Sequence, residues 1–302
     1  SVLGNIDPSS SAFSRSVARG IPDQVSAGAP SLTTRIALTF SGRGLDSKRA
    51  DRGIEAMAAE LGTRLPVLIS TLANGTGAGT SVRACVKQDI IDFTRTAYDP
   101  TVAAQIEQAR AQGGTGLTWG DAGPIYADDR QLDRYIHDRA VSKSWTMFEG
   151  PRGMFFSNSL RSLVAPTPGV LRKRVTMLYR PIPAGAAAKL AEDDINNARF
   201  AGSQKARASA HQQQRLRFAM KAAEEEAQGA GLVRFGMIVT VSCADASELP
   251  RLDKMIPSLS NQARLRVREA LGNQAVYFQA ALPLGVILPE HSLIPNNVKE
   301  LL

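Results

Sequence analysis

The stretches that decide the fold read Arg172-Lys-Arg-Val-Thr-Met-Leu-Tyr-Arg180 and Leu232-Val-Arg-Phe-Gly-Met-Ile-Val-Thr-Val-Ser242. Both alternate apolar residues with polar or small ones, which is typical of half-buried strands. A long helical sequence over residues 184–230 joins them, and a helix over residues 247–260 and a strand over Arg264–Arg268 follow. The order strand, long helix, strand, helix, strand predicts an α+β fold with a ferredoxin-like split βαβ sheet.

The long helical sequence predicts a projecting arm of two helices. Its two limbs carry apolar residues at helical spacing, but residues 201–215 contain no apolar side chain larger than alanine. Gly202 and Ser203 mark the break, since glycine lowers the stability of a helix by roughly 1 kcal/mol relative to alanine. We therefore expect a helical arm at about residues 184–230 with a basic tip.

The chain before this sheet reads as a smaller unit of strands and helices. The predicted elements are strands at residues 33–40 and 65–72 and helices at residues 45–61, 82–97 and 101–111. Five glycines and a proline fall within residues 112–124, which is typical of a boundary. We therefore expect an N-terminal α/β module over residues 1–115 and a C-terminal α+β module over residues 116–302, in which residues 142–148 are a further candidate strand and residues 155–164 a candidate helix.

The charge is basic but not decisive. The 302 residues carry 36 Lys and Arg against 28 Asp and Glu, a net charge of +8, and 27 of the basic residues are arginines. Arginine suits anionic partners, but a GC-rich genome gives the same bias. The sequence has no run of 18 apolar residues and only two cysteines, so a bilayer span and a disulfide framework are not predicted. Both thiols are expected to be reduced and buried.

A phosphate-binding loop is the first chemistry to consider. Gly75-Thr-Gly-Ala-Gly79 lies between a predicted strand and a predicted helix, where phosphate loops occur. The spacing differs from the dinucleotide fingerprint, and no Gly-Lys-Ser/Thr occurs in the sequence. We expect a connector there, with no binding or hydrolysis of ATP.

Metal and nucleophile chemistry have equally little support. His137-Asp138 resembles the pair used by metal phosphohydrolases, but only His211 and His291 remain as further histidines. A His–Asp hydrogen bond or a contact at a helix end is the structural alternative. Neither cysteine lies in a catalytic motif, and no Gly-x-Ser-x-Gly elbow occurs. We expect no catalytic residue, no metal and no cofactor, hence not an enzyme.

An extended similarity offers more than these motifs. Residues 172–200, 224–236 and 281–285 resemble a family of actinobacterial membrane-anchored proteins encoded on integrative conjugative elements. Those proteins are similar to the N-terminal, non-ATPase part of TraC-like conjugation ATPases. The resemblance extends over residues 95–290 and more loosely over residues 30–95. Shorter motifs agree with the family: Tyr98-Asp99-Pro100, Gly123-Pro124, Tyr135-x-His137-Asp138, Ser144-Trp145 and Ala165-Pro166.

The resemblance implies a structural or interaction component of a conjugative, type IV-like DNA-translocation apparatus. Other subunits of the apparatus, or further copies of the chain, would be its partners. The fragment would lie at the cytoplasmic face of the plasma membrane, with its anchor upstream of residue 1. The alternatives are a nucleic-acid-binding module that contacts transferred DNA, which is not favoured, and an EccE-like component of type VII secretion.

Strand alternation also predicts a candidate interaction surface. Within each of the last three strands the arginines occupy positions that share one face, so they project together on the side away from the helices. That open side would meet an acidic protein surface or solvent, since it lacks the aromatic residues that stack on RNA bases. Basic residues at the tip of the arm complete the surface. Its residues are Arg172, Arg174, Arg180, Arg234, Arg264, Arg266, Arg268, Lys205, Arg207 and Arg215.

Overall fold

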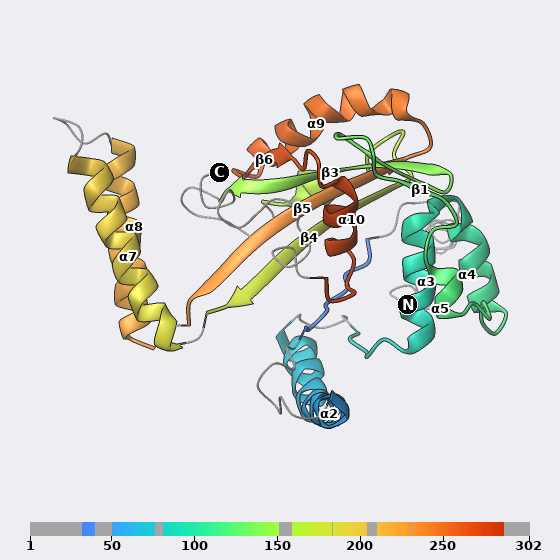
Figure 1. The fold of residues 1–302 in the computed structure, drawn as a ribbon, viewed down its shortest axis with the longest axis horizontal. Coiled ribbons are helices and arrows are strands. Elements are labelled where there is room, and N and C mark those ends of the chain that lie inside the picture. The colour runs from blue at the N-terminus through green and yellow to red at the C-terminus, as the bar shows by residue number, and fades with distance from the viewer. Residues whose placement is uncertain are drawn as a thin grey trace, which may run out of the picture.

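Three long strands form the body of an antiparallel sheet (Figure 1). β3 (Ala140–Glu149) is central and pairs with β5 (Val233–Cys243), which pairs on its other edge with β4 (Arg172–Pro181). β5 is buried on both faces from Met237 to Cys243, which explains its nearly continuous apolar and small-residue sequence. The computed structural model describes residues 32–39, 50–75, 81–150, 159–182, 184–203, 210–229 and 231–286.

Three short strands complete the sheet along the free edge of β3. β2 (Tyr135–His137) pairs with the first half of β3, and β1 (Ala127–Asp128) pairs with β2. β6 (Arg266–Glu269) pairs with the second half of β3. All pairings are antiparallel, so β5 and β6 run parallel to each other with β3 between them. The fold is α+β, as the sequence indicates, while the ferredoxin-like assignment stays a prediction.

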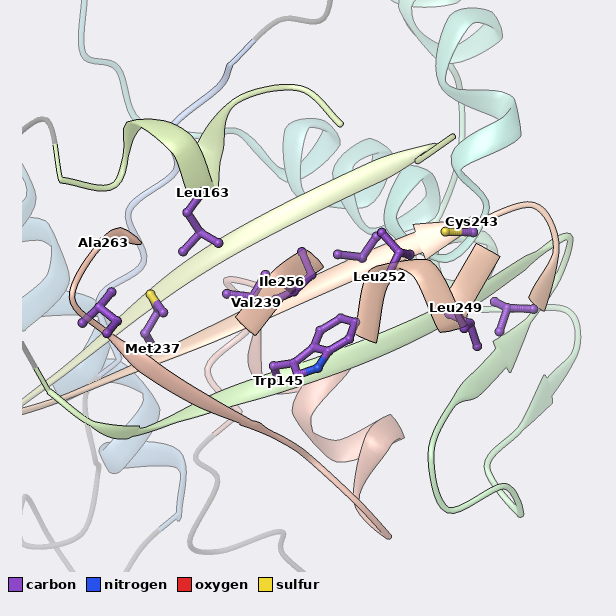
Figure 2. Close-up of a cluster of buried hydrophobic side chains, with 12 residues drawn as sticks. Trp145, Leu163, Met237, Val239, Cys243, Leu249, Leu252, Ile256 and Ala263 are labelled. Atoms are coloured by element: carbon purple, nitrogen blue, oxygen red, sulfur yellow. The ribbon is translucent and has the colours of Figure 1, made fainter. Parts of the chain in front are cut away.

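One face of the sheet is covered by α9 (Leu249–Gln262) and the short α6 (Arg161–Val164). Alternate residues of the strands point to these helices, among them Trp145 of β3 and Val239 of β5 (Figure 2). α9 meets them with Leu249, Leu252 and Ile256, which recur at helical spacing. Burial of each large apolar side chain stabilises the fold by roughly 1.5–3 kcal/mol, so this layer is the principal core.

A buried lysine ties this layer together. Lys143 of β3 is enclosed beside the ring of Trp145, and its ammonium pairs with Asp253 of α9 at 2.6 Å and Glu269 of β6 at 2.9 Å. Desolvation lowers the pKa of Lys143, but the hydrogen bonds to the two carboxylates outweigh it and raise that pKa above its ordinary value. The charge is therefore retained inside the protein and links a helix to two strands.

The opposite face of the sheet is covered by α10 (Gln274–Ala280) and α3 (Lys87–Tyr98) (Figure 1). Phe278 of α10 lies in a cluster with Phe93 and Tyr98 of α3 and Tyr135 of β2. α3 is flanked in turn by α4 (Ala103–Ala111) and α5 (Trp119–Ala122). The division into modules at residues 1–115 and 116–302 stays a prediction, although this cluster contains residues from both sides of it.

The first described segments differ from the sequence-based prediction. Residues 32–39 form no strand, and the strand predicted at residues 65–72 is part of α2 (Ala50–Gly75). The hydroxyl groups of Thr63 and Thr71 donate to carbonyls one turn earlier, which accommodates these β-branched residues within a helix. No described helix has both the length and the apolar character needed to cross a membrane. The glycine-rich residues 76–80 lie outside the described part of the chain.

Candidate functional site

A two-helix arm leaves the sheet between β4 and β5 (Figure 1). It consists of α7 (Ala184–Ser203) and α8 (Ala210–Ala227), which pack against each other, as the sequence predicts for residues 184–230. Ala187 and Ala191, one turn apart on α7, are buried, and their small side chains permit a close helix contact. Of the tip residues proposed for the interaction surface, Arg215 lies on α8, while Lys205 and Arg207 lie outside the described residues.

Apolar side chains remain exposed on the arm and at its base. Phe218 and Met220 of α8 are 49% and 42% exposed. At the base, Tyr179 of β4 and Phe235 of β5 are cross-strand partners, and both are exposed. Such side chains contribute little to the stability of the isolated chain, so the arm and its base offer apolar area to a partner.

The arginines of the strands share one face of the sheet, as alternation predicts. Arg180 pairs with Arg234 across β4 and β5, and Arg268 lies opposite Thr146 of β3. Val175 and Met177 of β4 belong to the core on the other face. The strand register was therefore predicted correctly for these residues.

The expectation that this face is open is wrong, because α3 and α10 cover part of it. Arg174 is 9% exposed, with its guanidinium 4.4 Å from the centre of the Phe278 ring. Arg172 is partly buried beside Phe93. Both arginines lie on the face of the sheet that α10 and α3 cover. Along each strand, the residues that face these helices alternate with the residues that face the main core.

The remaining arginines lie closer to solvent. Arg180 and Arg234 are exposed near the arm. Arg266 pairs with Glu149 at 3.1 Å and lies over the ring of Phe148, and Arg268 is exposed. Arg264 was predicted to lie in a strand, but β6 begins at Arg266, and Arg264 has φ of 59° in the preceding turn. The exposed arginines are thus spread along the rim of the sheet.

Between the sheet and α3 lies a chain of buried polar groups. His137 donates from Nδ1 to the carbonyl of Tyr98, the last residue of α3, and accepts at Nε2 from Ser142 Oγ, 2.7 Å away. Ser142 Oγ is in turn 2.6 Å from Ser242 Oγ on β5. Burial lowers the pKa of His137 to about 4, so the ring is neutral at ordinary pH.

This series of hydrogen-bonded groups includes a Ser–His pair, Ser142 and His137. The two side chains lie at the distance that separates a nucleophile from its base in hydrolases. His137 and Ser142 are fully buried among aromatic rings, and both imidazole nitrogens are already engaged. In this arrangement the pair ties α3 to β3 rather than facing a substrate or a metal. The contact of His137 with a helix end is the structural alternative that the sequence offered for this residue.

Asp138 has partners of its own. Its backbone has φ of 44°, and its Oδ1 accepts from the amides of Ile125 and Tyr126 at 2.7 and 3.0 Å. Its other oxygen pairs with Arg95 of α3 at 2.9 Å. His137 and Asp138 therefore make separate contacts with α3, and Asp138 also binds the backbone of residues 125 and 126.

Two further expectations concern cysteines and metals. Cys243 is buried, which raises the pKa of its thiol to about 11, whereas Cys85 is exposed, contrary to the expectation that both are buried. Within the described ranges, no three His, Cys, Asp or Glu residues are grouped so that they could hold a metal ion.

Arg35 is the residue that sequence reasoning missed. It comes from the extended segment 32–39 and lies over the ring of Phe93, with 4.2 Å between the guanidinium carbon and the ring centre. Arg172 lies over the same ring at 5.5 Å. No periodicity marks Arg35, because its place depends on a contact with α3 and β4 that is distant in the sequence.

Comparisons with protein-family models, with curated proteins and with solved structures found no match to this chain.

Proposed function

We propose that this chain is a non-catalytic structural and interaction component of a conjugative, type IV-like DNA-translocation apparatus. The observation that carries the proposal is the α7–α8 arm, which stands off the sheet with apolar side chains exposed. The assignment to conjugation is supported by the resemblance of residues 95–290. On that basis the chain works at the cytoplasmic face of the membrane.

The arm supports docking because the sheet does not need it. β4 and β5 pair directly up to Pro181 and Val233, so a tight turn would be enough to join them. The chain instead inserts two helices that mainly contact each other. Covering Phe218 and Met220 with a partner would yield about 25 cal/mol for each Å² of apolar surface removed from water.

Contact with nucleic acid is supported less well. Exposed arginines such as Arg180 and Arg234 can neutralise phosphates, but a sheet that reads RNA presents aromatic rings for stacking. On the arginine-bearing face, β4 instead carries Thr176, which donates to Ala281 O, and Leu178, which packs against the buried cluster that includes Ala281. An EccE-like role in type VII secretion differs from the proposed role only in the partner.

Site-specific photo-crosslinking in the full-length, membrane-embedded protein tests the proposal. A photoreactive residue at Phe218 or Met220 should cross-link to another subunit of the conjugation apparatus, whereas one at the exposed Leu132, in the β1–β2 connection, should not. The double variant Phe218→Ser/Met220→Ser should lower DNA transfer at unchanged protein level, because the apolar contact is lost.

Three results would argue against the proposal. Normal transfer by the double variant, with no cross-link from either arm position, would exclude the arm as the docking element. Cross-links to a type VII secretion subunit would favour the EccE-like alternative. Binding of an oligonucleotide with a steep negative slope of log affinity against log salt would favour the nucleic-acid alternative.

A further inference from the structure

Arg174 is a buried cation that finds no hydrogen-bond acceptor in the described part of the chain. It exposes 9% of its surface, and none of its three guanidinium nitrogens has a hydrogen-bond partner among the described residues. A guanidinium carries five N–H donors, and a buried charge is normally paired. The ring of Phe278, 4.4 Å away, offers a cation–π contact but accepts no conventional hydrogen bond. The described residues therefore supply no hydrogen-bond acceptor for the N–H donors of Arg174.

Two more arginines lie next to it. Arg172 precedes Arg174 by two residues on the same face of β4, and Arg35 shares the Phe93 ring with Arg172. Within the described ranges, none of the three forms an ion pair with a carboxylate. Burial and the charge of Arg172 lower the pKa of Arg174 to about 9, and burial and the charge of Arg35 lower that of Arg172. Positive charge thus accumulates here, and Asp89 near Arg35 and Glu107 near Arg172 offset it only in part.

Other arginines around α3 differ from this group. Arg83 and Arg110 both pair with Asp89, and Arg139 pairs with Asp99 at 2.9 Å. Carboxylates are therefore available in this part of the protein, but they are bound to other arginines. Glu107 favours the charged form of Arg172 without forming an ion pair with it.

The geometry points to a binding site for a phosphate group formed by Arg35, Arg172 and Arg174. Guanidinium groups bind phosphate oxygens through paired N–H donors, and a doubly charged anion balances three cations better than a single carboxylate does. Arg35 lies on a segment whose residues are all exposed, so this end of the group is reached from solvent, while Arg174 is the most deeply buried of the three. The burial of Arg174 favours a small ligand, inorganic phosphate or the phosphoryl end of a small phosphomonoester. This site lies apart from the arm and does not depend on its function.

Titration calorimetry and thermal unfolding test the site with sodium phosphate and with glycerol phosphate, each against sodium chloride at equal ionic strength. Saturable binding of at least one probe at millimolar or lower concentration is expected, with a rise in Tm. Comparison of the two probes distinguishes free phosphate from a phosphomonoester. Sodium acetate should bind at least tenfold more weakly than phosphate.

Three variants make the result specific. Arg174→Met and Arg172→Gln should weaken phosphate binding at least tenfold, and the exposed Arg35→Gln should weaken it without disturbing the core. Arg180→Gln is the matched control, since it lies on the same face of β4 but is exposed near the arm, and it should bind as the parent chain does. Absence of saturable binding in the parent chain, or binding that survives all three substitutions, would overturn the inference.

Discussion

His137 shows how one side chain sets a pH limit for the protein. Its Nδ1–H group is bound to the end of α3 and its Nε2 accepts from Ser142, so a second proton would break the latter bond. Burial, reinforced by the positive charge of Arg174, lowers the pKa of His137 to about 4, and Asp138 and Asp99 oppose this effect only in part. The folded protein therefore holds this ring neutral.

This predicts a loss of stability between pH 6.5 and pH 4. An unfolded histidine gains its proton near pH 6.5 and the folded one near pH 4, so the unfolded state binds more protons between these values. The free energy of unfolding should fall by about 3 kcal/mol across the window, measured by urea denaturation at pH 7.5, 5.5 and 4.5. His137→Gln should flatten this dependence even if it lowers stability at every pH; an equally steep fall in the variant would contradict the assignment.

Sequence reasoning at this scale identified some residues and missed others. Alternation placed Arg172, Arg174 and Arg180 on one face, because a strand has a fixed period. Alternation did not predict that Phe278 covers Arg174, because the position of the seven-residue helix α10 is determined by tertiary packing. Arg35 escaped notice for the same reason.

Among the elements, the arm is the one whose removal the sheet should tolerate. α7 and α8 mainly contact each other, and β4 and β5 are already aligned at Pro181 and Val233. Replacing residues 183–231 with an Asn-Gly turn should therefore shift the Tm of the remaining chain by only a few degrees. Circular dichroism melting and amide exchange of β5 provide the measurement.

A substitution in α10 provides the comparison for the arm deletion. Phe278→Ala should lower the free energy of unfolding by about 3–5 kcal/mol, because a large buried ring is removed. Collapse of the arm-deleted chain to the same extent would mean that the arm belongs to the core.

The elements that were predicted well have strong periods or clear breaks. β4, β5, α9 and the two-helix arm fall in this group. Residues 65–72 were predicted to be a strand, and they include the β-branched Val67, Ile69 and Thr71, yet α2 continues through them. A local sequence pattern predicts the type of an element correctly only when the tertiary contacts favour the same type.

In the whole molecule, ion pairs attach the α3 layer to the sheet. Asp99, at the end of α3, accepts from Thr101 and from Arg139 at the β2–β3 turn. Burial raises the pKa of Asp99, but these hydrogen bonds outweigh burial and lower the pKa below its ordinary value. The carboxylate therefore contributes stability above about pH 4, and the contribution disappears as the pH falls further.

We expect Asp99→Asn to loosen α3 without unfolding the sheet. Arg139 is well exposed and regains water, so the loss should be about 1–2 kcal/mol at pH 7. Amides of α3 should exchange faster while those of β5 stay protected. Asp245→Ala, which removes an exposed side-chain cap from the 3-10 turn before α9, is the control and should leave α3 exchange unchanged. Equal acceleration in β5 would show that the two layers unfold as one unit.

The pairing of β4 with β5 also determines how the protein responds to force. The arm is attached where the two strands end, at Pro181 and Val233. A pull on the arm away from the body would load the ladder at that end, so its residue pairs would open one after another, starting with Pro181 and Val233, instead of all resisting together. Tension on the arm would therefore peel β4 from β5 at low load, and it would reach the pair of Arg174 and Thr240 only after the pairs nearer the arm had opened.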